Sequence, residues 1–85
     1  MIIIYGTPSC GFCNDAVNLA RKHKLKYEYL DITYSKNYRL LRSKNVDMQK
    51  IPHIWWDDKY VGHFGEFYAE IQKHLIMEEL NIATS

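Results

Sequence analysis

Two cysteines, Cys10 and Cys13, are separated by two residues and are the only cysteines in the chain. They lie where a short apolar segment gives way to helical spacing. A thiol at the start of a helix is close to unpaired backbone N–H groups, which stabilise a thiolate. A second thiol one turn later can reach the first sulfur. The pair therefore predicts thiol–disulfide exchange: Cys10 attacks a substrate disulfide, and Cys13 then attacks the Cys10 sulfur and releases the reduced product.

The residues around the cysteines tune this exchange. Gly11 lets a substrate backbone come close, and Phe12 forms an apolar wall beside the sulfur. No Lys or Arg lies between Tyr5 and Ala20. We therefore expect backbone dipoles and hydrogen bonds, rather than a neighbouring cation, to lower the pKa of the Cys10 thiol.

A structural zinc site is an alternative use of the cysteine pair. Such a site needs four ligands, and the two missing ones would have to be histidines, which are His23, His53, His63 and His74. No two of them have the short spacing of a zinc finger. The strand-to-helix position of the cysteines favours redox chemistry, so we expect no metal. Near the active-site edge, we interpret His53 and His63 as surface or hydrogen-bonded histidines rather than acids.

The elements that position the cysteines follow from apolar patterning. The expected strands comprise residues 2–5, 26–32, 53–56 and 60–61. The first expected helix starts at or just after Cys10, has apolar residues from Cys13 to Ala20 at helical spacing, and ends near the basic residues 21–24. The other two are a segment after a cap at Ser35 and a segment from Glu66 to about Leu80. The strand–helix–strand order at the beginning of the chain implies a parallel strand pair. The short turn at residues 57–59 implies an antiparallel hairpin. The order β-α-β-α-β-β-α predicts an α/β protein with a mixed sheet and helices on its faces, which is a thioredoxin-like arrangement.

Charge and hydropathy limit the possible partners and locations. A net charge of +1, from eleven basic and ten acidic residues, provides no strong field for nucleic acid or an anionic membrane. The apolar segment Met1–Gly6 is too short for a signal peptide, and no run approaches the roughly 20 apolar residues that span a bilayer. We expect one domain over residues 1–85 in the cytoplasm, where structural disulfides rarely persist.

Three segments carry a resemblance to a known family: Tyr5–Cys13, the Ile51-Pro52 step, and Val61-Gly62 before the last helix. Together they resemble the glutaredoxin family over nearly the whole chain, in its small bacterial or viral dithiol form. The resemblance implies a four-stranded mixed sheet with three helices, with Cys10 as nucleophile and Cys13 as resolving thiol. It also implies a monomer, glutathione as reductant, and disulfide-containing client proteins such as a ribonucleotide reductase.

The same resemblance implies the residues that bind glutathione and substrate. A cis peptide bond before Pro52 would lie near the disulfide and expose the Ile51 backbone, which could pair with an extended substrate strand. Gln49 and Lys50 are placed next to Ile51 to meet the glycine-end carboxylate of glutathione. The full expected set comprises Thr7, Phe12, Gln49, Lys50, Ile51, Pro52, Gly65 and Glu66.

Two positions depart from the family pattern. Thr7 stands where members often have a Lys that helps to hold a glutathione carboxylate. The turn before the last helix usually reads Gly-Gly-x-Asp-Asp, whereas here it is Gly62-His63-Phe64-Gly65-Glu66. Backbone N–H groups at this helix start can still bind the γ-glutamyl carboxylate, and Glu66 can accept from the α-amino group. We therefore predict weaker glutathione binding than that of a typical member.

Two other functions fit parts of this pattern. The weak glutathione features at Thr7 and Gly65 fit a thioredoxin-like donor that is recycled by a flavoprotein reductase. The Cys-Gly-Phe core also resembles the monothiol branch, in which two protomers share an iron–sulfur cluster through Cys10 and glutathione thiols. Cys13 stands where that branch has Ser. A second thiol argues against a cluster carrier, because it competes by forming a disulfide.

Overall fold

A mixed sheet with the strand order β2-β1-β3-β4 is the centre of the molecule. The computed structural model describes the backbone of residues 1–84 and the side chains of residues 1–80. Within them, the strands are β1 (Ile2–Gly6), β2 (Tyr27–Asp31), β3 (His53–Trp56) and β4 (Lys59–Gly62). Strand β1 pairs parallel with β2 and antiparallel with β3, and β3 pairs antiparallel with β4. The predicted parallel start and terminal hairpin are both confirmed.

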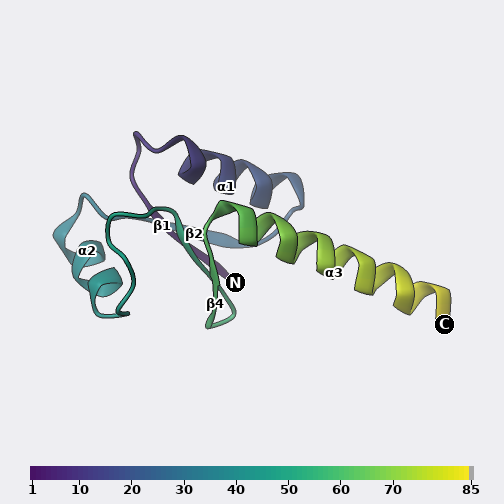
Figure 1. Ribbon diagram of the computed structural model, residues 1–85. Coiled ribbons are helices and arrows are strands. Elements are labelled where there is room, and N and C mark those ends of the chain that lie inside the picture. Colours follow the sequence, from purple (N-terminus) through teal and green to yellow (C-terminus); the bar gives the residue numbers. More distant parts are fainter. Residues whose placement is uncertain (85) are drawn as a thin grey trace.

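Three helices, counted over residues 1–84, complete the predicted order β-α-β-α-β-β-α. They are α1 (Gly11–Lys22), α2 (Ser35–Arg42) and α3 (Phe64–Thr84). Helices α1 and α3 contact each other and the sheet, whereas α2 lies apart from them beside β2 (Figure 1). None of the helices in this part of the chain has the length and apolar character needed to cross a membrane.

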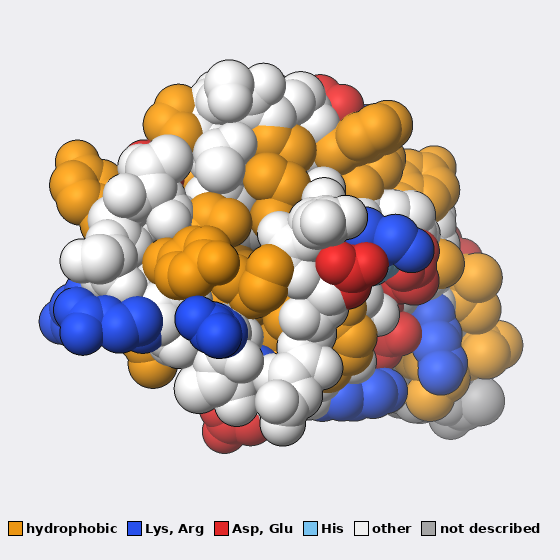
Figure 2. Space-filling view, turned by 60° about the vertical axis from the view of Figure 1, so that its left-hand side comes forward, with side chains coloured by type: hydrophobic (Ala, Val, Ile, Leu, Met, Phe, Trp, Pro, Cys, Tyr) orange, Lys and Arg blue, Asp and Glu red, His pale blue; other side chains and the backbone are white. Residues whose placement is uncertain are grey.

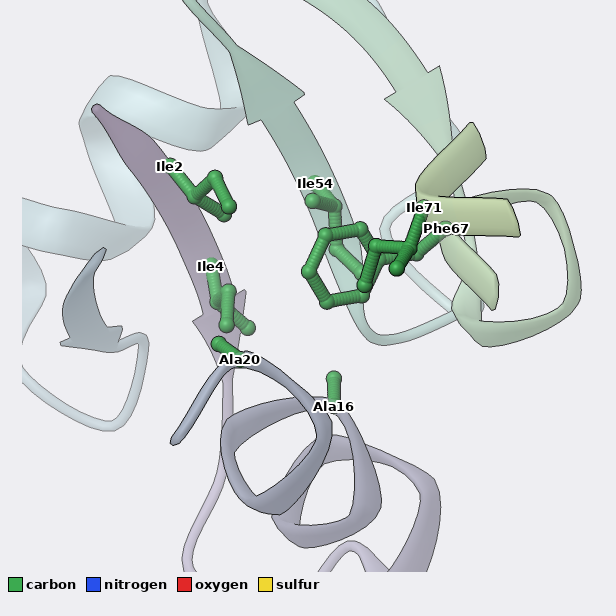
Figure 3. Packing of buried hydrophobic residues seen from close by; sticks show 7 residues of the cluster. All are labelled: Ile2, Ile4, Ala16, Ala20, Ile54, Phe67 and Ile71. Carbon is green, nitrogen blue, oxygen red and sulfur yellow. The ribbon is translucent and has the colours of Figure 1, made fainter. Parts of the chain in front are cut away.

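The core forms where one face of the sheet meets α1 and α3. Alternate residues of a strand point to the same face, so Ile2 and Ile4 of β1 face the helices. Each side chain of the cluster is at most 2% exposed, and full burial of one such large apolar side chain contributes about 1.5–3 kcal/mol. Figure 3 shows the cluster, which consists of Ile2, Ile4, Ala16, Ala20, Ile54, Phe67 and Ile71. The small alanines let α1 pack close to the strands.

Strand direction brings two helix starts together. Because β1 and β4 are both antiparallel to β3, they run in the same direction and end at the same edge of the sheet. Helix α1 begins beyond the end of β1, and α3 begins after the end of β4 with only His63 between them. Strand β3 begins at this edge, immediately after the Ile51-Pro52 step. The topology thus gathers three segments that are far apart in the sequence.

Helix α3 is longer at both ends than the apolar stripe predicts. It begins at Phe64 rather than Glu66, and it continues to Thr84 rather than ending near Leu80. Neither Gly nor Pro follows Leu80, so the strongest helix-ending residues are absent there. The helix therefore runs out beyond the sheet (Figure 1), and Ile76 in its second half is 57% exposed.

The start of α2 also differs from the prediction. Ser35 is the first helical residue, and Tyr34 is the N-cap residue. The side chain of Tyr34 makes no capping hydrogen bond. Asp31 at the end of β2 organises the turn instead. Its Oδ1 accepts hydrogen bonds from the backbone N–H and the hydroxyl of Thr33, at 2.9 and 2.7 Å, and its carbonyl accepts from Asn37 Nδ2 at 2.9 Å. The predicted Ser35 cap is therefore wrong.

Apolar side chains also reach the surface. Figure 2 shows the side of the molecule that carries α2 and the loop before α1, with hydrophobic side chains near its centre and Lys and Arg side chains beside them. Phe12, in the first turn of α1, is 63% exposed. An exposed aromatic ring next to the cysteines is available for contact with a substrate.

Candidate active site

Cys10 and Cys13 form a disulfide at the start of α1. Cys10 caps the helix: the backbone N–H of Cys13 points at Cys10 Sγ, with an N–S distance of 3.2 Å. No acidic residue lies in the first turn of α1. Cys10 is half-buried, whereas Cys13 is completely buried. When the disulfide is reduced, the N–H of Cys13 and the helix dipole would therefore stabilise a thiolate on the more accessible sulfur.

A close approach behind the disulfide depends on Gly6. A Cβ atom at Gly6 would lie 2.5 Å from Cys13 Sγ and 2.7 Å from the hydroxyl of Tyr29. That hydroxyl donates a hydrogen bond of 2.9 Å to the carbonyl of Thr7, which also accepts from the backbone N–H of Cys10 at 3.3 Å. Burial, followed by the charge of Asp31, raises the pKa of Tyr29 above its ordinary value, so the hydroxyl stays protonated. Tyr29 thus anchors the loop that presents Cys10.

The Ile51-Pro52 peptide bond is cis, as predicted. The carbonyl oxygen of Ile51 lies 3.9 Å from Cys10 Sγ. Pro52 is buried, and Ile51 is half-buried. The segment before β3 therefore lies directly beside the more accessible cysteine of the pair.

A groove of about 290 Å³ runs beside this segment. Its lining residues are Phe12, Ile51, Pro52, His63, Phe64 and Gly65. The rings of Phe12 and Phe64 lie 6.0 Å apart between centroids and form one aromatic wall. Four of the expected substrate-binding residues are in this lining, and His63 supplies its one ionisable side chain. The groove suits an extended, largely apolar segment next to a disulfide.

The other four expected binding residues do not line the groove. Thr7 uses its carbonyl to hold the Cys10 loop. The backbone N–H groups of Gln49 and Lys50 donate to Oδ1 and the carbonyl of Asp47, at 3.0 and 3.2 Å, and both residues are exposed. Glu66 Oε1 accepts the backbone N–H of His63 at 3.2 Å. One carboxylate oxygen of Glu66 thus caps the start of its own helix.

His53 is buried behind the groove, and both of its ring nitrogens are bonded. Nε2 lies 2.7 Å from the carbonyl of Asp47, which can only accept, so Nε2 donates. Nδ1 then accepts from the hydroxyl of Tyr60 at 2.9 Å. Burial lowers the pKa of His53 below its ordinary value and raises that of Tyr60, so both stay neutral in this arrangement. His53 is a hydrogen-bonded histidine, one of the two roles expected from the sequence.

His63 was expected near the active-site edge but not as a binding residue, Phe64 was not expected in the site, and Tyr29 was not predicted as an anchor. For His63 and Phe64 a signal existed, because they belong to the turn that departs from the family pattern. Tyr29 had no such signal, since only the pairing of β2 with β1 brings it to the loop at Thr7. Within residues 1–84, no group of three or more His, Cys, Asp or Glu side chains is arranged to hold a metal ion.

Comparison with known proteins connects this geometry to a family. Residues 2–61 match the family model for glutaredoxin. A glutaredoxin from Haemophilus influenzae is 33% identical over 75 residues, covering 80% of this chain and 86% of that protein. Reduced Escherichia coli glutaredoxin has a similar structure, with a TM-score of 0.71, 25% identity, and coverage of 87% and 95%. A buckwheat glutaredoxin–glutathione complex gives a TM-score of 0.70 at 13% identity, with coverage of 94% and 76%.

The matched segment contains both cysteines and Pro52, and the Escherichia coli structure covers 87% of this chain. The thioredoxin-like fold predicted from the order of elements is thereby confirmed. The disulfide-linked pair at a helix start is the chemical group that thiol–disulfide exchange requires. This chain therefore belongs to the glutaredoxin family of thiol–disulfide oxidoreductases.

Proposed function

We propose that the protein is a dithiol glutaredoxin that takes its electrons from glutathione and reduces protein disulfides and glutathione mixed disulfides. The observation that carries this proposal is the difference between the two cysteines. Cys10 is half-buried, caps α1 and lies beside the Ile51 carbonyl, whereas Cys13 is completely buried one turn later. This asymmetry suits Cys10 as nucleophile and Cys13 as resolving thiol.

The proposed cycle moves two electrons. The Cys10 thiolate attacks one sulfur of the substrate disulfide, forms a mixed disulfide and displaces the other sulfur as a thiolate. The Cys13 thiolate then attacks Cys10 Sγ, which releases the second substrate sulfur as a thiolate and forms the Cys10–Cys13 disulfide. One glutathione thiolate opens this disulfide at Cys10, and a second one releases oxidised glutathione.

Substrate binding in this proposal uses the groove and its margins. The Ile51 backbone pairs with the extended substrate, and Phe12, Pro52 and Gly65 form the surface against which it lies. Gln49 and Lys50 immediately precede Ile51, where they can meet the glycine-end carboxylate of glutathione. Thr7 borders the site through its loop. The second carboxylate oxygen of Glu66 is the proposed acceptor for the α-amino group, since the first one accepts the N–H of His63.

The wider setting belongs to the same proposal. Glutathione is kept reduced in the cytoplasm, so we propose that location. We also propose that residues 1–85 form one domain that acts as a monomer. A ribonucleotide reductase, which needs a disulfide reduced in each cycle, is the client protein proposed by family analogy.

An assay with two electron donors tests the proposal. Wild type, Cys10→Ser and Cys13→Ser are assayed with glutathione plus its reductase, and separately with a thioredoxin reductase. With glutathione and its reductase, wild type should reduce both a glutathionylated peptide and a protein disulfide. With thioredoxin reductase as the electron source, it should reduce neither. Cys10→Ser should lose at least about 100-fold in both reactions, because no other thiol can attack first.

The Cys13→Ser variant distinguishes the two reactions. It should keep activity on the glutathionylated peptide and lose activity on the protein disulfide, because only the second reaction needs a resolving thiol. Full activity of Cys10→Ser would contradict the assigned nucleophile. Efficient recycling by thioredoxin reductase alone would instead identify a thioredoxin-like donor, and a stable brown protein after anaerobic iron–sulfur reconstitution would identify a cluster carrier.

A further inference from the structure

His63 connects the start of α3 to the segment beside the disulfide. It stands between β4 and α3, lines the groove, and is half-buried. Its Nδ1 lies 2.8 Å from the carbonyl oxygen of Pro52. A carbonyl oxygen can only accept a hydrogen bond, so Nδ1 carries the proton and donates. The neutral imidazole is therefore held as the Nδ1–H tautomer.

The hydrogen bond from His63 holds the residue next to Ile51, whose carbonyl group faces the Cys10 sulfur. Pro52 follows Ile51, whose carbonyl oxygen lies 3.9 Å from Cys10 Sγ. Residues 43–52 lie in neither a helix nor a strand, so no sheet hydrogen bond holds Ile51 itself. The position of its carbonyl depends on what holds the neighbouring peptide groups.

A second histidine holds the other end of the same segment. The buried His53 donates from Nε2 to the carbonyl of Asp47 at 2.7 Å, and its own orientation is set by the hydroxyl of Tyr60. The rings of His53 and His63 lie 4.8 Å apart between centroids. Two adjacent imidazoles, protonated on opposite nitrogens, thus bond to carbonyls at both ends of residues 47–52.

We propose that His63 is a positioning residue for thiol–disulfide exchange: by donating to Pro52 it keeps the Ile51 backbone where a substrate strand pairs next to Cys10. No hydrogen bond joins His63 to either sulfur, so the proposed effect passes through Pro52 and Ile51. The inference rests on the proposed function in one respect, that the substrate pairs with Ile51. It does not depend on which donor recycles the enzyme.

The alternative role for His63 is purely structural, and the two roles predict different measurements. A structural role lowers the melting temperature and leaves substrate saturation unchanged in the folded fraction. A positioning role raises the substrate concentration needed for half-maximal rate and leaves the chemistry at Cys10 unaltered. The readouts are therefore the split between saturation and maximal rate, and rescue by a side chain that restores the donor.

The experiment uses protein reduced beforehand with dithiothreitol and freed from it, so that a single turnover is followed without an electron donor. The substrate is a short extended peptide joined by a disulfide to a second thiol. Wild type is compared with His63→Ala, His63→Asn, His63→Gln and His74→Ala. An Asn amide can place a donor near the position of Nδ1, whereas a Gln amide reaches towards the position of Nε2. His74 is a control because its ring stacks on Trp56 (centroids 4.5 Å apart), at the opposite end of β3 from the groove.

We expect His63→Ala and His63→Gln to raise the half-saturating peptide concentration about three- to tenfold, the factor that one neutral hydrogen bond contributes. The maximal rate should stay within about twofold, and alkylation of Cys10 by iodoacetamide should be unchanged. His63→Asn should return to within about twofold of wild type, and His74→Ala should not alter saturation. Nitrogen-15 NMR of the wild-type imidazole should show the proton on Nδ1.

Three results would overturn the proposal. The first is wild-type saturation in a folded His63→Ala protein. The second is equal saturation of the Asn and Gln variants, which decides the matter even where the Ala variant does not fold. The third is an Nδ1 without a proton in wild type. Failure of the proposed function looks different, because wild type itself would then not reduce the peptide at any concentration.

Discussion

Two helices begin at the same edge of the sheet, and the groove lies between their starts. Each follows a strand that ends in glycine: Gly6 ends β1, and Gly62 ends β4. At the start of α1, the N–H of Cys13 points at Cys10 Sγ, and the first turn has no acid. At the start of α3, Glu66 in the first turn accepts the N–H of His63. Both helices open with the same backbone hydrogen bond, from Asn14 N–H to the Cys10 carbonyl at 3.1 Å and from Phe67 N–H to the His63 carbonyl at 3.0 Å, and they differ in their side chains.

This difference shows that a helix N-terminus is an anion site only where the chain leaves its N–H groups available. All helices have unpaired N–H groups in the first turn. In α1 one of these groups, the N–H of Cys13, points at the Cys10 sulfur, whereas in α3 the N–H of His63 is already bonded to the carboxylate of Glu66. At one end of the groove a helix N–H group is therefore directed at the Cys10 sulfur. At the other end such a group is already bonded to a carboxylate of the same chain. Weaker binding of glutathione carboxylates than in a typical family member stays a prediction.

The two glycines make room for these two arrangements. At Gly6 an added Cβ would meet Cys13 Sγ at 2.5 Å, inside the rigid neighbourhood of the disulfide. At Gly62 it would meet Glu66 Oε1 at 2.8 Å, and the backbone φ of +123° disfavours any other residue. Gly6 therefore leaves space for the disulfide at the start of α1, and Gly62 leaves space for the Glu66 carboxylate at the start of α3.

The largest expected effect comes from filling the space at Gly6. Gly6→Ala should lower the free energy of unfolding by about 1–3 kcal/mol, because the methyl group overlaps atoms that cannot move away easily. For a domain of this size, the melting temperature should fall by about 4–8 °C for each kcal/mol. Thermal unfolding of the oxidised and reduced proteins measures the loss.

Gly11→Ala is the matched control for this change. Nothing lies within 4 Å of a Cβ at Gly11, and Ala favours the helix over Gly. Its melting temperature should therefore be at least that of wild type. A Gly6→Ala protein as stable as the Gly11→Ala protein would show that the strand end and the disulfide can move apart.

The next effect concerns the cap at the start of α3. Glu66→Ala should destabilise the protein by about 0.5–1 kcal/mol, because the N–H of His63 loses its acceptor and the helix start loses a favourable charge. Glu66→Gln keeps an oxygen that can accept this N–H, so it should lose less than half as much. Denaturant unfolding of the three proteins provides the comparison. Identical stability of all three would mean that the carboxylate is not committed to its own helix.

The smallest effect tests whether charge alone can make the two helix starts alike. Gly11→Glu places an acid in the first turn of α1, where it disfavours the Cys10 thiolate. Alkylation of the reduced protein by neutral iodoacetamide at mildly acidic pH should slow about two- to fivefold, the factor expected for a charge at a helix terminus. Gly65→Glu is the control, because its site is equally open but belongs to α3. Equal slowing in both variants would indicate a general charge effect.

Much of the fold was predictable because it depends on local patterns. The apolar run of β1, the helical spacing after Cys13 and the turn at Asp57 each reflect interactions among residues close in the chain. The order of elements then leaves few ways to build the sheet. Errors occurred where local signals were weak, at the cap of α2 and at both ends of α3.

The site was predictable in part, for a similar reason. The cysteine pair and the cis bond before Pro52 follow from short motifs and the resemblance they carry. For Glu66 the motif was ambiguous, because the same carboxylate can cap its helix or meet a ligand. The structure assigns one oxygen to the cap.

By itself, the sequence determined the chemistry and the order of elements: two thiols one helical turn apart, a strand before them and a proline step later. Only the tertiary structure decided the contacts between remote segments, such as Tyr29 with Thr7 and His63 with Pro52. The physical reason is that a hydrogen bond forms only when the donor–acceptor distance is correct to within a few tenths of an ångström. Such distances between remote residues arise only once the strands are in register and the helices are packed.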